Sequence, residues 1–239
     1  MNAEGQEAQR VRDEYYSRAF KSCGKGLSVG PGVRIVNPQY IEVGDNVSID
    51  AGVTLMARGP LGIKLGNNVN LTQRVYLDTE DPDEGYITIG NGVYVGTGTS
   101  LFGHKGLEIG DHSLLAQNIS LTPYSHIFED PNTVIIAQGG HSRKVTIGRD
   151  VYIGMNSTIL YSADIGDGCV VGSATVVVKP LPPYSVAVGN PARIIRRRGE
   201  EKKEEIEPLR FKLWHISHKK QIYHKKPSAS NAHSAEYRK

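Results

Sequence analysis

The sequence predicts an all-β fold, a parallel β-helix, from three observations. Aliphatic residues recur every six positions, glycine follows many of them, and large aromatic residues are scarce, with 27 Gly against 4 Phe and 1 Trp in 239 residues. A period of six fits neither the turn of an α-helix nor simple strand alternation. Regular repeats of this kind indicate a solenoid, in which each repeat packs against its neighbours.

The repeat is most regular between residues 145 and 180. Each unit of six is a short strand followed by a turn, with its aliphatic side chain in a narrow interior and glycine at the corner. Three units make one triangular coil, and stacked coils form a prism. An irregular β-sandwich is the alternative, but its strands would recur every 8–12 residues or so. The phased residues of this block are Ile147, Ile153, Ile159, Ile165, Val171 and Val177.

The same pattern occurs earlier in the chain with interruptions. Loops of more than about 15 residues are uncommon and usually functional or disordered, and one such break separates Leu121 from Ile147. The apolar run from Val134 to Ala137 within it needs a surface to pack against. We therefore expect function in a protruding loop at residues 122–146. The earlier interior positions are Val29, Ile35, Val43, Ile49, Leu55, Leu65, Leu71, Leu77, Ile89, Val95, Leu101, Ile109, Leu115 and Leu121.

Three parts are predicted along the chain. Residues 1–26 form an N-terminal helical cap, because apolar residues at helical spacing lie in this charged segment and solenoids need capped ends. Residues 27–192 form the β-helix domain, and residues 193–239 form a basic C-terminal extension.

Charge is divided between the body and the tail. Residues 193–239 hold 14 Lys and Arg against 6 Asp and Glu, whereas residues 1–192 hold 14 against 19. An acidic body excludes a basic nucleic-acid-binding domain. The tail can form a charged helix with an apolar patch, and we interpret it as a solvated extension rather than a contact with an anionic membrane surface. The patch would comprise Leu209, Leu213 and Trp214.

Two further features concern the cellular compartment. No apolar run approaches the roughly 20 residues that span a bilayer, and the first 16 residues contain no hydrophobic segment typical of a signal peptide. Cys23 and Cys169 lie far apart without metal-ligand spacing. They indicate reduced thiols in a cytoplasmic protein.

The second half of the chain resembles a known family. The segment His126-Ile-Phe-Glu-Asp-Pro131, then VTIGRDVYIG, and above all Lys179-Pro-Leu-Pro and Val188-Gly-Asn-Pro-Ala-Arg193 are similar to sugar O-acetyltransferases of the hexapeptide-repeat family. Maltose, galactoside and polysaccharide acetyltransferases belong to it. The match covers residues 40–196. The resemblance implies a left-handed β-helix, acetyl-CoA as co-substrate, a sugar or glycan acceptor, and a homotrimer with active sites between subunits.

The resemblance also implies a catalytic residue. In the family, a histidine at the start of the protruding loop is the general base for direct attack of the acceptor hydroxyl on the thioester, and His126 matches it by position. An imidazole suits this role because its pKa lies near neutrality. His141, in the same loop, is the rival. His104 and His112 fall at coil corners, where exposed polar residues are expected anyway.

Coenzyme A contacts carry over less directly. In related enzymes the pantetheine arm lies along the prism between subunits, and basic residues meet the phosphates, as suits Lys and Arg. Two departures bear on this binding: Tyr152 stands where the family usually has Trp, and Gly172-Ser-Ala-Thr175 replaces Gly-Ala-Gly-Ser. The matching positions are Gly154, Met155, Ser173, Val178, Lys179, Arg193 and Arg196.

Three alternatives stay open at this point. An amino-sugar N-acetyltransferase uses the same base and the same coenzyme. A zinc-dependent carbonic anhydrase is built on the same prism but needs three converging histidines, and that family's closely spaced histidine pair is missing here. A solenoid scaffold without chemistry is the third.

Overall fold

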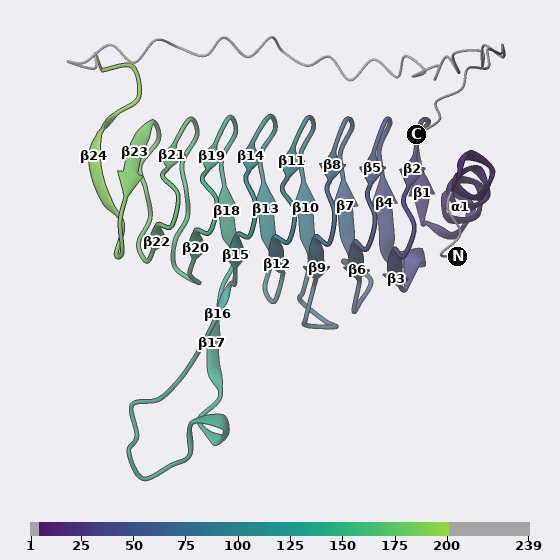
Figure 1. Cartoon of the computed structure of the whole chain (residues 1–239). Helices are drawn as coiled ribbons and strands as arrows, with labels where there is room; N and C mark the ends of the chain where they lie inside the picture. The colour runs from purple at the N-terminus through teal and green to yellow at the C-terminus, as the bar shows by residue number, and fades with distance from the viewer. Residues whose placement is uncertain (1–4, 201–239) are drawn as a thin grey trace, which may run out of the picture. The chain divides into compact units, whose positions relative to one another are not determined.

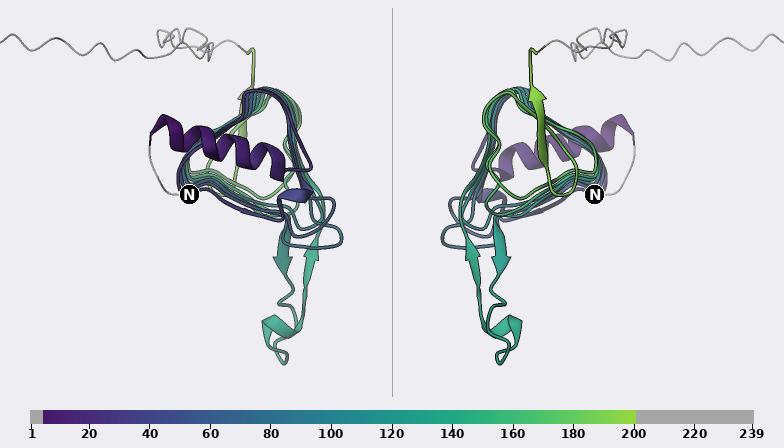
Figure 2. Two further views of the ribbon diagram at one scale, coloured as in Figure 1. Left: turned by 90° about the vertical axis from the view of Figure 1, so that its right-hand side faces the viewer. Right: turned by 90° about the vertical axis from the view of Figure 1, so that its left-hand side faces the viewer.

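The computed structural model describes residues 5–200. They form a parallel β-helix in which three sheets run along the three faces of a prism (Figures 1 and 2). The strands of successive coils pair in parallel, as in Ile87 beside Leu107 and Ile63. In the regular block the coil length is 18 residues, because Ile147 bridges Ile165. The predicted fold class is confirmed.

Three long sheets build the prism. Sheet 1 contains β1 (Ser22–Cys23), β4 (Ile41–Val43), β7 (Ile63–Leu65), β10 (Ile87–Ile89), β13 (Leu107–Ile109) and β18 (Val145–Ile147). Sheet 2 contains β2 (Ser28–Val29), β5 (Ser48–Ile49), β8 (Asn70–Leu71), β11 (Tyr94–Val95), β14 (Leu114–Leu115), β19 (Tyr152–Ile153), β21 (Val170–Val171), β23 (Ser185–Val188) and β24 (Arg193–Arg197). Sheet 3 contains β3 (Arg34–Val36), β6 (Thr54–Met56), β9 (Tyr76–Asp78), β12 (Ser100–Phe102), β15 (Ser120–Leu121), β20 (Thr158–Ile159) and β22 (Val176–Val177).

The interior is the predicted aliphatic stack. All six phased residues from Ile147 to Val177 are buried, and so are the earlier ones except Ile35, which is partly buried. Narrow coils leave room for a single layer of Ile, Leu and Val on each face. This explains how a chain with few large aromatic residues builds one continuous core.

The structure shows why glycine follows the phased aliphatics, and the reason differs from the turn conformation expected from the sequence. Their backbones carry no positive φ; instead, a Cβ on Gly148 would overlap the Asp167 carboxylate and the backbone of the next coil. Gly44 meets the backbone of Gly66 in the same way. Left-handed backbone occurs two residues later, for example at Gly32 (φ 69°). Close approach of stacked coils, rather than turn conformation, excludes a side chain at the first kind of position.

Helix α1 (Gln6–Ala19) covers the first coil (Figure 2). It lies within the predicted cap segment, and no helix in residues 5–200 has the length and apolar character of a membrane span. Tyr16 and Phe20 bury their rings against the core. Arg12 donates from Nε to the carbonyl of Val29 at 2.9 Å, and the Val29 amide donates to Asp13 at 2.7 Å. These bonds satisfy edge groups that an uncapped first coil would expose.

Only the first residues of the predicted C-terminal extension, 193–200, belong to the described structure. Strand β24 pairs antiparallel with β23 and extends sheet 2. The predicted tail helix with Leu209, Leu213 and Trp214 lies outside the described residues.

One corner of the prism differs from the other two. Most connections from sheet 1 to sheet 2, and from sheet 2 to sheet 3, are four-residue turns, such as 90–93 and 96–99. Connections from sheet 3 back to sheet 1 vary in length and contain the short 3-10 helix η1 (Pro38–Tyr40). We call this edge the insertion corner; its segments are 37–40, 57–62, 79–86, 103–106 and 122–144.

The predicted loop at 122–146 is the longest insertion, and it is a two-stranded arm. β16 (Tyr124–His126) and β17 (Gly140–Ser142) pair antiparallel, with His126 opposite Gly140, and η2 (Ile135–Ala137) lies near the tip. Figures 1 and 2 show the arm projecting away from the prism. Every irregular segment of the coils therefore lies along one edge, and the arm extends that edge outward.

Candidate functional site

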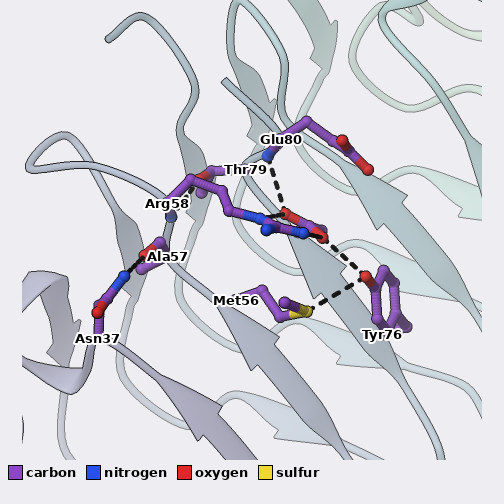
Figure 3. A network of polar contacts seen from close by, with 8 residues as sticks. Asn37, Met56, Ala57, Arg58, Tyr76, Thr79 and Glu80 are labelled. Carbon is purple, nitrogen blue, oxygen red and sulfur yellow. Dashed lines mark hydrogen bonds and ion pairs between the residues drawn. The ribbon is translucent and has the colours of Figure 1, made fainter. Parts of the chain in front are cut away.

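An ion pair between exposed Arg58 and buried Asp78 organises the insertion corner (Figure 3). Arg58 donates from Nε to Oδ1 of Asp78 at 2.9 Å and from Nη2 to Oδ2 at 2.7 Å. Tyr76 Oη donates to the same carboxylate at 2.7 Å, and so does the Glu80 amide at 2.9 Å. Thr79 completes the junction by accepting from the Arg58 amide at 2.8 Å. The network joins the insertions of two successive coils.

The network shifts the pKa of two of its members. Burial opposes ionisation of Asp78, but bonds from Arg58, Tyr76 and the Glu80 backbone outweigh it and hold the pKa of that carboxyl below its usual value. Burial, with the hydrogen bond to Asp78, raises the pKa of Tyr76 to about 12. Asp78 is therefore ionised and Tyr76 neutral at pH 7.

Three rings stand in a column farther along the same corner. His104, from the insertion that follows β12, stacks on Tyr124 with centroids 4.8 Å apart and planes 18° from parallel. Tyr124 meets His126 edge-on, with centroids 4.9 Å apart and an angle of 85°. Tyr124 Oη lies 3.5 Å from His126 Nδ1. His126 is exposed at the root of the arm.

His104 differs from the prediction of an exposed corner residue. It is half-buried, and its Nδ1 is buried without a hydrogen-bond partner among the described residues. Burial lowers the pKa of His104, and the carboxylates of Glu80, Asp81 and Asp78 only partly oppose this. The short insertion 103–106 turns back beneath the arm, which brings this ring under Tyr124. A hexad count cannot show that.

The arm's tip is held by polar bonds and leaves its apolar residues outside. Gln138 donates from Nε2 to the carbonyls of Asp130 and Thr133, at 3.0 and 2.7 Å, and Thr133 Oγ1 donates to Asp130 at 2.6 Å. The apolar run that was expected to pack against a surface is exposed among residues 5–200. Its exposed side chains, with Phe128, are Val134, Ile135 and Ile136.

The predicted coenzyme positions fall into three places. Gly154, Met155 and Ser173 lie together at one corner on successive coils, where the Ala174 amide donates to the Met155 carbonyl at 2.8 Å. Gly154 is buried, whereas Met155 and Ser173 are exposed.

The other coenzyme positions lie elsewhere on the last coils. Val178 and Lys179 follow β22 at the insertion corner, and Arg193 and Arg196 lie on β24. Within residues 5–200, no hydrogen bond or ion pair joins His126 to any of the seven coenzyme positions. The structure thus brings three of them together and places the remaining four in two further groups.

Other predicted residues are also placed. His141 is exposed on β17, and His112 occupies a corner with φ 60°. In the described part of the chain, no three His, Cys, Asp or Glu side chains form a group that could hold a metal ion. Cys23 and Cys169 are both free thiols.

Sequence reasoning missed Arg58, Tyr76 and Asp78. The available signal was the spacing: Leu77 and Ile89 are twelve residues apart with no phased aliphatic between them. An insertion could have been inferred there. The contact between Arg58 and Asp78 could not have been inferred, because the two residues lie 20 positions apart and meet only where coils stack.

Two family models match the chain. Residues 144–179 match the model described as bacterial transferase hexapeptide (six repeats), and residues 41–57 match the hexapeptide repeat of succinyl-transferase. Both segments lie in the regular coils, so they report on the solenoid rather than on the arm.

Curated proteins and a solved structure are similar over longer stretches. A probable acetyltransferase of Mycobacterium tuberculosis is 32% identical over 166 residues, covering 69% of this chain and 54% of its own. The putative colanic acid biosynthesis acetyltransferase WcaF of Escherichia coli is 30% identical over 139 residues, covering 58% and 71%. A solved N-acyltransferase, AntD of Bacillus cereus with dTDP and coenzyme A, has a TM-score of 0.57 at 25% identity, covering 84% and 93%. The chain spans about half the length of several curated relatives that it matches.

Proposed function

The chain belongs to the hexapeptide-repeat acyltransferase family, and from this we propose that it transfers an acetyl group from acetyl-CoA to a hydroxyl of a sugar or glycan, with His126 as general base. The observation that carries the proposal is the place of His126. It lies on the first strand of the longest insertion, exposed, while all other irregular segments gather along the same edge. An imidazole in that place can reach a substrate that lies outside the coil.

The proposed reaction has two steps, attack on the thioester and loss of the thiolate. His126 takes the proton of the acceptor hydroxyl, and the oxygen attacks the thioester carbonyl carbon to give a tetrahedral intermediate. The C–S bond then breaks, and the imidazolium returns the proton to the departing thiolate. The products are the acetyl ester and free coenzyme A. A group with a pKa near neutrality suits both the uptake and the return of the proton.

Coenzyme A is proposed to lie along the last coils. Met155 and Ser173 are exposed at one corner, beside Gly154, which is buried against the backbone of the next coil. Together with Val178 they would line the path of the pantetheine arm. The cationic side chains that would meet its phosphates are Lys179, Arg193 and Arg196, which pair charge with hydrogen-bond donors.

We propose that the enzyme is a homotrimer with its sites between subunits. Two observations support this. In residues 5–200, no hydrogen bond or ion pair joins His126 to the coenzyme positions of its own chain, and a neighbouring chain would supply the second half of the site. The arm also presents Phe128, Val134, Ile135 and Ile136 to solvent, an apolar surface that a neighbour would cover. Such an interface satisfies both observations at once.

Amino-sugar N-acylation is the second candidate. The similar AntD structure is described as an N-acyltransferase with dTDP and coenzyme A, which favours an amine acceptor. An amine needs the same removal of a proton during transfer. Assays with a hydroxyl sugar and its matching amino sugar separate the two, because the preferred acceptor has the higher kcat/KM.

The compartment and the tail are also matters of proposal. Free Cys23 and Cys169 support a cytoplasmic location. The acidic body supports an enzyme without a nucleic-acid partner. Membrane-surface contact by the basic tail remains the less favoured interpretation.

His126→Ala tests the catalytic assignment. Loss of a general base lowers kcat by about 10²- to 10⁴-fold, while coenzyme A binding, measured by calorimetry, persists. His141→Ala is the matched control on the partner strand and should retain turnover. Wild-type turnover of His126→Ala would contradict the assignment of the base. Failure of the wild-type protein to bind coenzyme A would contradict the enzyme itself and favour a scaffold.

A further inference from the structure

The column of rings at the root of the arm constrains Tyr124 on two sides. Its ring lies flat on His104, which comes from the coil next to the arm's own coil. On the arm, Gly140 pairs with His126, and a Cβ on Gly140 would overlap the Tyr124 hydroxyl. The Tyr124 ring can therefore lie over β17 only because residue 140 has no side chain. A side chain held in this way is pre-oriented rather than free.

The Tyr124 hydroxyl meets one ring nitrogen of His126. Oη lies 3.5 Å from Nδ1, a long contact of the kind that tightens when substrates bind. Which nitrogen of a neutral imidazole carries the proton depends on the hydrogen bond made by the other nitrogen. A base needs the lone pair of Nε2 for the acceptor, so its proton must reside on Nδ1.

We propose that Tyr124 is a positioning residue: its Oη accepts a hydrogen bond from Nδ1–H of His126, which keeps that proton on Nδ1 and leaves Nε2 free to take the acceptor proton. The proposal rests on His126 being the base, and it goes beyond that assignment by naming what sets its tautomer and ring direction. Tyr124 touches neither substrate in this role. It acts through His126 alone.

His104 supports the arrangement from below. Its flat contact with Tyr124 holds the phenol ring in place, and its Nδ1 is buried without a hydrogen-bond partner in the described part of the chain. Burial lowers the pKa of His104, so this ring is neutral near pH 7. A second cation beneath the column would make protonation of His126 harder. A neutral flat ring supplies contact without that cost.

Tyr124→Phe is the central test, because it keeps the ring and removes only Oη. In protein with ¹⁵N-labelled histidine at about pH 8, where imidazole is neutral, the wild-type His126 signal should report the Nδ1–H tautomer. In Tyr124→Phe it should shift toward Nε2–H. We expect kcat to fall about tenfold, less than on loss of the base itself, with KM for acetyl-CoA unchanged. His126→Gln identifies the signal by its disappearance.

Three controls separate positioning from general damage. Gly140→Ala should displace the Tyr124 hydroxyl and reproduce the tautomer shift. Gly139→Ala adds a methyl group where no atom lies within 4 Å, so it shows the effect of backbone strain alone, at a φ of 77°. His104→Phe keeps a flat ring under Tyr124 and should retain activity that His104→Ala loses. Tyr15→Phe removes a hydroxyl from the outer face of α1 and should change nothing.

The outcomes distinguish this proposal from the proposed function. If His126→Ala is inactive but Tyr124→Phe keeps both kcat and the Nδ1–H signal, the positioning role is wrong and the base assignment stands. If His126→Ala is fully active, the base assignment fails, although the tautomer measurement still reports whether Tyr124 holds the ring. An unchanged Nδ1–H signal in Gly140→Ala would also overturn the positioning role.

Discussion

Arg58 holds the carboxylate of Asp78 with two hydrogen bonds, at 2.9 and 2.7 Å, although Asp78 is completely buried and 41% of the Arg58 side chain is exposed. The pair joins the insertion after β6 to the end of β9. A buried carboxylate needs such partners, since an unpaired one would carry a large desolvation cost. The edge of the prism that bears the arm is thus braced by charge as well as by packing.

Asp78→Asn should destabilise the protein by about 3 kcal/mol, because it leaves Arg58 without its ionic partner and weakens every bond to the former carboxylate. Urea denaturation measures the change. Asp83→Asn, on the exposed turn of the same insertion, is the control and should cost less than about 0.5 kcal/mol. Equal stability of the two variants would show that the network does not brace the corner.

Stability should also fall in acid through Asp78. The folded-state pKa of Asp78 lies below that of an ordinary aspartate, so the ionised form stabilises the fold above the unfolded pKa. That contribution is lost as the pH falls through the folded pKa, below about pH 4. Denaturation between about pH 5 and 2 should therefore show a shallower decline for Asp78→Asn than for the wild type. Parallel curves would contradict the low pKa.

Gly148→Ala should destabilise the coils by about 3 kcal/mol, because its methyl group would overlap the next coil. Gly32→Ala is the informative comparison, since its nearest atom is 3.8 Å away and only its φ of 69° opposes a side chain. That penalty is about 1 kcal/mol. Thermal unfolding of the two variants measures the difference. A reversed order would mean that turn conformation, not coil contact, selects these glycines.

Ile136→Asp should weaken the proposed trimer. Ile136 is 86% exposed in the single chain, and burying such a side chain against a neighbour contributes roughly 1.5–3 kcal/mol. A charge there should raise the dissociation constant at least about tenfold, as measured by analytical ultracentrifugation. Val11→Asp, on the outer face of α1, introduces the same charge at a side chain that is 57% exposed. Dissociation in that control alone would point to a different interface.

The regular part of the fold was predictable because it is local. Each phased aliphatic needs only a partner of the same kind one coil away, so the period shows the interior from Val29 to Val177. The position of the arm followed from the same count, as the place where the period breaks. His126 needed the family resemblance as well, since its loop alone offered His141 on equal terms.

Other features depend on stacking. The arm's strands were not expected, and the half-buried position of His104 contradicts the exposed corner residue that its place in the repeat predicts. His104 and Tyr124 lie 20 residues apart, as do Arg58 and Asp78. The same spacing separates other residues one coil apart, such as Ile87 and Leu107, so it does not mark these contacts.

The sequence by itself determined the period of the coils, and with it the interior, the corners and the break that forms the arm. Short-range periodicity specifies these features, because every coil repeats the same packing problem. Only the tertiary structure decided that all insertions share one edge, that Arg58 reaches Asp78, and that His104 lies under Tyr124. Those contacts arise between successive coils, and their geometry depends on how each insertion turns back onto its neighbour.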